Sequence, residues 1–139
     1  METRQETTFM GNPMTLLGHK VKVGEKAPKF VALKEDLTPF TLEEVAGKVK
    51  LISVVPSVCE LQTIRFNKEA GELKDVAIIT ISVDLPFAVG RFCAAKNIDN
   101  AVVVSDYNKH SFGLGYGFLI DELQLLNRGI VVIDKDNVI

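Results

Sequence analysis

The apolar residues of this chain fall into short runs of valine and isoleucine, with longer stretches of helical spacing between them. The runs predict four buried strands, at residues 49–55, 76–83, 102–104 and 130–133. The spacing between them predicts helices at residues 59–73, 86–96 and 109–116. Nearly continuous apolar strands that alternate with helices are typical of an α/β fold with a largely parallel sheet covered on both faces.

The first part of the chain has shorter apolar pieces and turns rich in glycine and proline. Gly11-Asn12-Pro13 between two apolar pieces predicts an N-terminal β-hairpin. Residues 41–44 have capping-box spacing, which predicts a short helix ending at Gly47. At the other end, Val138-Ile139 begins a second arm after a turn. We therefore expect one domain, residues 1–139, whose natural chain continues into another strand and a helix.

Composition excludes several classes of function. The chain has 139 residues, 47% of them apolar and 24% charged, with a net charge of −2, so no basic surface for nucleic acid is expected. Its apolar runs are far shorter than the roughly 20 residues that cross a membrane, and its polar start does not resemble a signal peptide. Two cysteines are too few for a secreted disulfide framework. We expect a cytoplasmic protein without membrane or nucleic-acid partners.

Cys59 has the clearest chemical potential in the sequence. It follows a predicted strand and Pro56, and it opens a predicted helix. Unpaired backbone N–H groups and the helix dipole at such a position favour an anion, which lowers the pKa of a thiol. The alternative is a small buried residue in a helix start, where Ser57 and Glu60 have capping-box spacing. The strand-to-helix position favours the reactive thiol.

Two further residues are candidates for the same chemistry. Cys93 lies near the end of the helix at residues 86–96, which Asp84 is predicted to cap, and taken alone it could be a core residue. A disulfide with Cys59 would require local unfolding, because the two Cα atoms must come within about 7 Å. Arg128 enters the last strand, either as a surface arginine or as a guanidinium aimed at a thiolate or bound oxyanion.

Other motifs do not support a metal or a cofactor. His19 and His110 lack the short ligand spacing of a zinc site with the cysteines. The glycines at residues 113–117 do not form a dinucleotide-binding fingerprint after a strand. No C-x-x-C pair is present, which excludes a thioredoxin-type dithiol exchanger. We expect no metal and no bound cofactor.

Several segments together carry a resemblance that spans essentially the whole chain. They are Thr8-Phe9-Met10-Gly11-Asn12-Pro13, Val23-Gly24-Glu25-Lys26-Ala27-Pro28, Asp84-Leu85-Pro86-Phe87-Ala88 with Arg91-Phe92-Cys93, Ser105-Asp106-Tyr107, and the strand that follows Arg128. On these residues the chain resembles the bacterial thiol peroxidases, the atypical two-cysteine branch of the peroxiredoxins.

The resemblance implies a thioredoxin-like fold and a peroxidase that uses no cofactor. Cys59 would be the peroxidatic cysteine, which attacks hydrogen peroxide or an organic hydroperoxide, and Cys93 would be the resolving cysteine. Arg128 would stabilise the thiolate and orient the peroxide, and Pro56 would shield the site. The resemblance also implies reduction by thioredoxin and a homodimer.

The segment before Cys59 departs from the family pattern Pro-x-x-x-Thr/Ser-x-x-Cys. Pro56 precedes Cys59 by only three positions, so the hydroxyl residue of the pattern has no counterpart. Either the loop is truly shorter, which would impair peroxide activation, or four residues of the natural loop are missing from the sequence as given. We favour the second explanation, because a catalytic loop that unfolds locally is often disordered. The alternative function is a non-catalytic redox-sensing or protein-binding module with a shortened loop.

Overall fold

Three parallel strands make the centre of the main sheet. The structure is a computed structural model, and it describes residues 2–57, 61–70, 75–96 and 102–139. In spatial order the six strands of the sheet are β10 (Gly129–Ile133), β5 (Val49–Val54), β6 (Val76–Ser82), β7 (Val102–Ser105), β3 (Ala32–Leu33) and β4 (Pro39–Phe40). β5, β6 and β7 pair in parallel, while the pairings toward both edges are antiparallel. The sheet is therefore mixed, and parallel pairing is confined to its three central strands.

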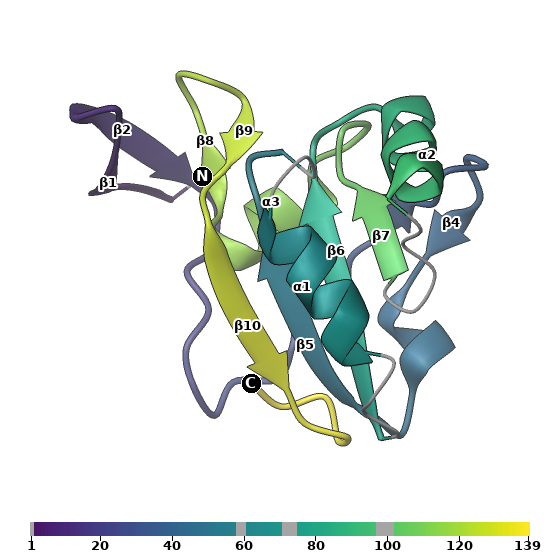
Figure 1. Ribbon diagram of the computed structural model, residues 1–139. Coiled ribbons are helices and arrows are strands. Elements are labelled where there is room, and N and C mark those ends of the chain that lie inside the picture. Colours follow the sequence, from purple (N-terminus) through teal and green to yellow (C-terminus); the bar gives the residue numbers. More distant parts are fainter. Residues whose placement is uncertain (1, 58–60, 71–74, 97–101) are drawn as a thin grey trace.

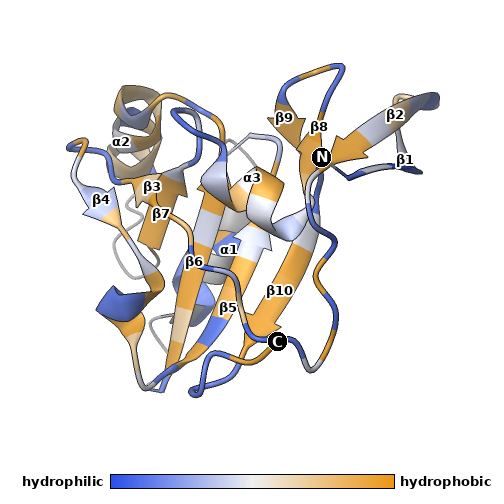
Figure 2. Cartoon of the chain, turned by 180° about the vertical axis from the view of Figure 1, so that it is seen from behind, coloured by the Kyte–Doolittle hydropathy of each residue, from blue (hydrophilic) through white to orange (hydrophobic). Residues whose placement is uncertain are grey.

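Helices cover both faces of this sheet (Figures 1 and 2). α1 (Leu61–Ala70) and α2 (Pro86–Ala95) lie over one face, and the short α3 (Ser111–Tyr116) lies over the other. The strands between them carry the strongest apolar colouring in Figure 2, because both of their faces are buried. The predicted α/β, thioredoxin-like architecture is confirmed.

The core beneath α3 is built around three aromatic rings. Phe30 meets Phe112 and Tyr116 edge-on, with ring centroids 5.1 and 5.7 Å apart, and Phe112 stacks on Tyr116 at 4.5 Å. These side chains pack against Ile52 and Ile79 of the central strands. The buried Tyr116 hydroxyl donates to the carbonyl of Pro28 at 2.7 Å. This bond satisfies the one polar atom that the ring carries into the core.

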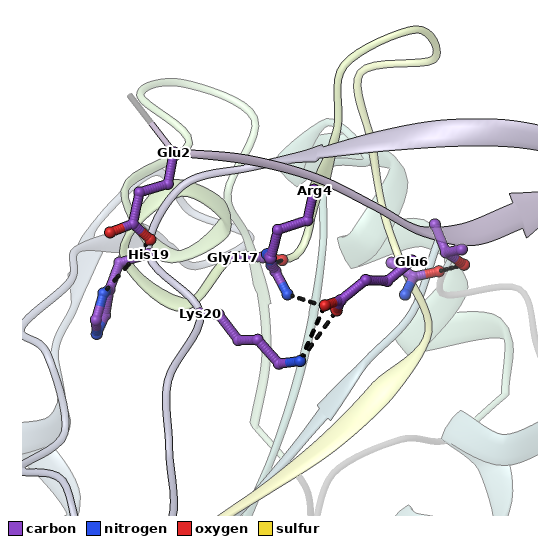
Figure 3. Close-up of polar contacts among 8 residues, drawn as sticks. Glu2, Arg4, Glu6, His19, Lys20 and Gly117 are labelled. Carbon is purple, nitrogen blue, oxygen red and sulfur yellow. Dashed lines mark hydrogen bonds and ion pairs between the residues drawn. The ribbon is translucent and has the colours of Figure 1, made fainter.

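The N-terminal hairpin belongs to a second, antiparallel sheet. In spatial order its strands are β1 (Thr3–Phe9), β2 (Asn12–Leu17), β8 (Leu119–Ile120) and β9 (Leu125–Leu126). The predicted hairpin is confirmed, whereas β8 and β9 were not expected, since two-residue strands carry too little pattern. Figure 3 shows how polar side chains hold the hairpin: Arg4 Nη2 donates to the carbonyl of Gly117 at 2.5 Å, and Glu6 accepts from Arg4 and Lys20.

Most predicted elements are present with shifted ends, and one predicted contact is wrong. Asp84 does not cap α2: the N-cap residue is Leu85, and no side chain accepts a hydrogen bond from the first turn. The Asp84 carboxylate instead accepts a hydrogen bond from Ser82 Oγ at 3.0 Å. The predicted short helix near residue 42 is a 3₁₀ helix, η1 (Leu42–Val45). The ends of the predicted helix at residues 59–73 lie outside the described residues.

The last residues return to the connector that follows β2. Val138 bridges Lys26, and the Ile139 amide donates to the carbonyl of Glu25 at 2.9 Å. The turn before them is held by the buried Lys50, whose Nζ donates to Asn137 Oδ1 at 2.5 Å. The expected continuation beyond this point stays a prediction. None of the described helices has the length and apolar character needed to cross a membrane.

Candidate active site

The carboxyl ends of β5, β6 and β7 lie at one edge of the main sheet, and β10 begins at the same edge (Figure 1). Open α/β sheets place their ligand sites beyond the carboxyl ends of parallel strands. Polar or charged residues follow each strand at this edge: Ser57 after β5, Asp84 after β6 and Asp106 after β7. The topology also places two of the predicted site residues at this edge, Pro56 after β5 and Arg128 before β10.

Pro56 and Arg128 come from adjacent strands. In the antiparallel pairing of β10 with β5, Gly129 is opposite Val54. Arg128 precedes Gly129 and Val55 follows Val54, so the same antiparallel register places Arg128 beside Val55, the residue before Pro56. The Arg128 side chain is exposed. A guanidinium at this position can reach an anion that forms beyond the end of β5.

Gly129 is needed for the close packing at the start of β10. A Cβ atom at this position would lie 2.5 Å from the ring of Phe118. Phe118 in turn stacks on Phe112 with ring centroids 5.8 Å apart. The backbone next to Arg128 therefore packs directly against the aromatic rings of the core.

Cys59 itself lies outside the described residues, as does Glu60. The predicted thiolate at a helix start, and the capping box between Ser57 and Glu60, therefore stay predictions. The flanking segments are described on both sides, up to Ser57 and again from Leu61 in α1.

Cys93 carries a free, half-buried thiol on α2. It packs with Phe92 and with Ile64 of α1 against a small apolar cluster formed by Val55, Val89 and Val103. Val55 follows the last residue of β5 and precedes Pro56 in the sequence. Sequence reasoning could not anticipate this cluster, because it joins α2 to the end of β5, a strand three elements earlier in the chain.

The electrostatic surroundings of Cys93 favour its neutral form. Burial raises the pKa of the Cys93 thiol to about 11, and the negative charge of Glu35 contributes in the same direction. Since the thiolate is the nucleophilic form, Cys93 is a poor nucleophile at neutral pH while it stays in this position. It is suited to act second, after a conformational change.

The turn into α2 is firmly held, whereas the helix body is not. The Asp84 amide donates to Ser82 Oγ at 3.2 Å, and Ser105 Oγ on the next strand donates to the Asp84 carbonyl. Within α2 only Pro86 and Val89 are buried, and Gly90 weakens the helix interior by roughly 1 kcal/mol relative to alanine. An anchored start and a weakly held body let the helix open locally.

Asp106 has a structural role that the sequence did not predict. Its carboxylate is buried and accepts the backbone N–H groups of Phe112 at 3.0 Å and Gly113 at 2.8 Å, which begin α3. Burial raises the pKa of Asp106 despite these two bonds. The only sequence signal is an acidic residue directly after an apolar strand.

The part of the chain that the structure describes contains no metal cluster at the predicted site. No three His, Cys, Asp or Glu side chains among the described residues come together as metal ligands. His19 lies between Glu2 and Glu25 at the surface instead. A cavity of about 730 Å³ separates the hairpin from β10, but Pro56, Cys93 and Arg128 do not line it.

Comparisons with known proteins show the family to which the chain belongs. The Redoxin family model matches residues 22–139. The chain is 53% identical over 134 residues to a thiol peroxidase of Halalkalibacterium halodurans, covering 94% of this chain and 81% of that protein. It is 48% identical to a thiol peroxidase of Streptococcus sanguinis, covering 96% and 84%. The crystal structure of a peroxiredoxin-like protein from Aquifex aeolicus, 32% identical, superposes with a TM-score of 0.87 over 99% of this chain and 84% of that chain.

Proposed function

The chain belongs to the bacterial thiol peroxidases of the redoxin family, and we propose that Cys59 and Cys93 are its peroxidatic and resolving cysteines. It is a thiol-dependent peroxidase of the peroxiredoxin type, which reduces a peroxide at the expense of a thiol. The alternative, a non-catalytic sensing or binding module, is not favoured by this membership. The packing of Cys93 against the apolar cluster that contains Val55, the residue after β5, is the observation that supports the pairing of the two thiols.

In the first step the Cys59 thiolate attacks one oxygen of the peroxide and breaks the O–O bond. Cys59 becomes a sulfenic acid, and the other oxygen leaves as water or an alcohol after taking up a proton. Arg128, at the neighbouring strand start, stabilises the thiolate and the charge that develops on the leaving oxygen. Pro56, which follows the end of β5, is proposed to shield the peroxidatic sulfur from water.

In the second step Cys93 resolves the sulfenic acid. Its thiol sulfur attacks the Cys59 sulfur, a disulfide forms, and the hydroxyl leaves with the thiol proton as water. Cys93 starts half-buried against the apolar cluster that contains Val55. We propose that α2 opens locally to bring Cys93 to Cys59, because a disulfide needs Cα atoms within about 7 Å. The weakly held body of α2 supports this role.

The finer assignments rest on the resemblance of the chain to its family. The disulfide would be reduced by thioredoxin through thiol exchange, in the cytoplasm, and the substrates would be hydrogen peroxide and organic hydroperoxides. A homodimer is proposed because Leu85 and Phe87, at the start of α2, expose 57% and 61% of their surface. A second copy of the chain would cover this apolar surface beside the site. Sedimentation of the purified protein tests whether it forms a homodimer.

Intact mass spectrometry of the wild type, Cys59→Ser and Cys93→Ser tests the roles of the two thiols. After one equivalent of hydrogen peroxide, the wild type is expected to lose two hydrogens and Cys93→Ser to gain oxygen. Cys59→Ser is expected to stay unchanged and to lack peroxidase activity. Activity that survives Cys59→Ser would exclude the proposed mechanism. The starting mass also shows whether the loop before Cys59 is as short as in these 139 residues.

A further inference from the structure

The turn between β3 and β4 lies beside α2 (Figures 1 and 2). In this turn Glu35 approaches the helix at Gly90. A Cβ atom at Gly90 would lie 3.1 Å from Glu35 Oε2 and 3.2 Å from Glu35 Cβ. The missing side chain at Gly90 therefore makes the space in which the Glu35 side chain rests against the helix.

The neighbours of Glu35 in the turn are engaged elsewhere. Lys34 pairs with Glu44 on η1 at 2.5 Å, and Asp36 Oδ1 accepts a hydrogen bond from the amide of Thr38. Among the described residues Glu35 has neither a hydrogen bond nor an ion pair. Its carboxylate is therefore exposed beside α2 and pairs with no described cation.

Gly90 and Cys93 are three positions apart on α2, and residues at that spacing are neighbours on one side of a helix. A carboxylate resting on Gly90 is therefore close to the Cys93 sulfur. The charge of Glu35 disfavours the Cys93 thiolate, in addition to the larger effect of burial. No described cation offsets this effect at Cys93.

On the basis of the proposed function, we propose that Glu35 is a positioning residue for the resolving step. Its carboxylate adds to the effect of burial in disfavouring the Cys93 thiolate while α2 is closed, so that Cys93 becomes more reactive when the helix opens toward Cys59. Opening removes Cys93 from both the apolar cluster and Glu35. The freed thiol then ionises more readily and attacks the Cys59 sulfenic acid, forming the disulfide and releasing water.

The experiment measures the alkylation rate of Cys93 in the reduced protein, read from the peptide that carries it. The variants are Glu35→Gln, Glu35→Asp and, as a matched control, Glu43→Gln on η1, whose exposed charge does not act on Cys93. Removing the charge should lower the pKa of the Cys93 thiol, and we expect the alkylation rate to increase by about twofold, because the larger thiolate fraction outweighs the lower nucleophilicity. Glu35→Asp and Glu43→Gln should alkylate at the wild-type rate.

Salt separates an electrostatic role from a structural one. At about 1 M salt the Debye length falls to roughly 3 Å, so the wild-type rate should approach that of Glu35→Gln. Equal rates of wild type and Glu35→Gln at low salt would overturn the proposal. A faster rate of Glu35→Gln that persists unchanged at high salt would also overturn it, because loosened packing would then be the cause.

The alkylation assay needs no peroxide turnover, so the two proposals fail separately. If peroxidase recycling survives Cys93→Ser, Cys93 is not the resolving cysteine and the role of Glu35 is lost with the proposed function. If recycling requires Cys93 but alkylation ignores the charge at residue 35, only the role of Glu35 is refuted.

Discussion

Replacing Asp106 tests the contact that holds α3 to the end of the main sheet. His110, the N-cap residue of α3, has a left-handed backbone and provides no side-chain cap. The two N–H groups that a cap would satisfy, those of Phe112 and Gly113, instead donate to Asp106, six and seven residues earlier. Asp106→Ala leaves both donors buried without this partner.

The structure sets the size of the effect. A hydrogen bond to a charged group contributes about 1.5–3 kcal/mol, and the Asp106 carboxylate accepts two. Part of this gain is offset by the burial of the charge, which the raised pKa of Asp106 reflects. We expect Asp106→Ala to lower the free energy of unfolding by about 3 kcal/mol, and Asp106→Asn, which keeps one acceptor oxygen, by roughly half as much.

Urea unfolding of the wild type and variants measures this difference. A loss of about 3 kcal/mol should also lower the Tm by roughly 10 °C in a domain of this size. The control is Asp136→Ala, because this exposed aspartate lies in the last turn. Its effect should stay within about 0.5 kcal/mol. A change below that limit in Asp106→Ala, or equal losses for alanine and asparagine, would refute the reasoning.

The difference in free energy of unfolding between the wild type and Asp106→Ala should also depend on pH, and the shifted pKa of Asp106 determines the direction of that dependence. Because the pKa of Asp106 in the folded protein lies above its ordinary value of 3.8, the folded form retains the proton that the unfolded form has lost. Stability from this group therefore falls as the pH rises from 3.8 through the folded pKa. The difference between wild type and Asp106→Ala should accordingly be larger in acid than at neutral pH.

Two further predictions concern the hairpin and the site. Gly18→Ala should lower stability by about 3 kcal/mol or more, because the φ of Gly18 is +98° and a Cβ would lie 2.1 Å from the Leu114 carbonyl oxygen. Gly24→Ala, with φ +91° and no atom within 4 Å, should lose only about 1 kcal/mol in the same thermal melt, and equal losses would contradict the steric argument. Arg128→Ala should lower kcat/KM for hydrogen peroxide about 100-fold, because we propose that the guanidinium stabilises the negative charge that develops in the transition state. Unchanged peroxide kinetics would remove Arg128 from the mechanism.

The structure describes three of the predicted site residues, Pro56, Cys93 and Arg128, whereas Cys59 lies outside the described residues. Pro56 and Arg128 come to one edge because β10 pairs with β5, and Cys93 on α2 packs against the apolar cluster that contains Val55. The sequence allowed each of these residues to be predicted separately, because a strand end, a helix start and an arginine before a strand can each be recognised from the neighbouring residues. The distances between them depend on strand order, which no local signal contains.

The sequence by itself determined the α/β class, the central strands, the N-terminal hairpin and the position of α2. Those features follow from periodic burial and from turn residues, which act within a few positions of the chain. The brief strands β8 and β9, the Asp106 contact with α3 and the approach of Glu35 to Gly90 were decided only by the tertiary structure. Each of these three features is stabilised by contacts between groups that are separated in the sequence. Their partners are defined only when the sheets have assembled around the buried strands.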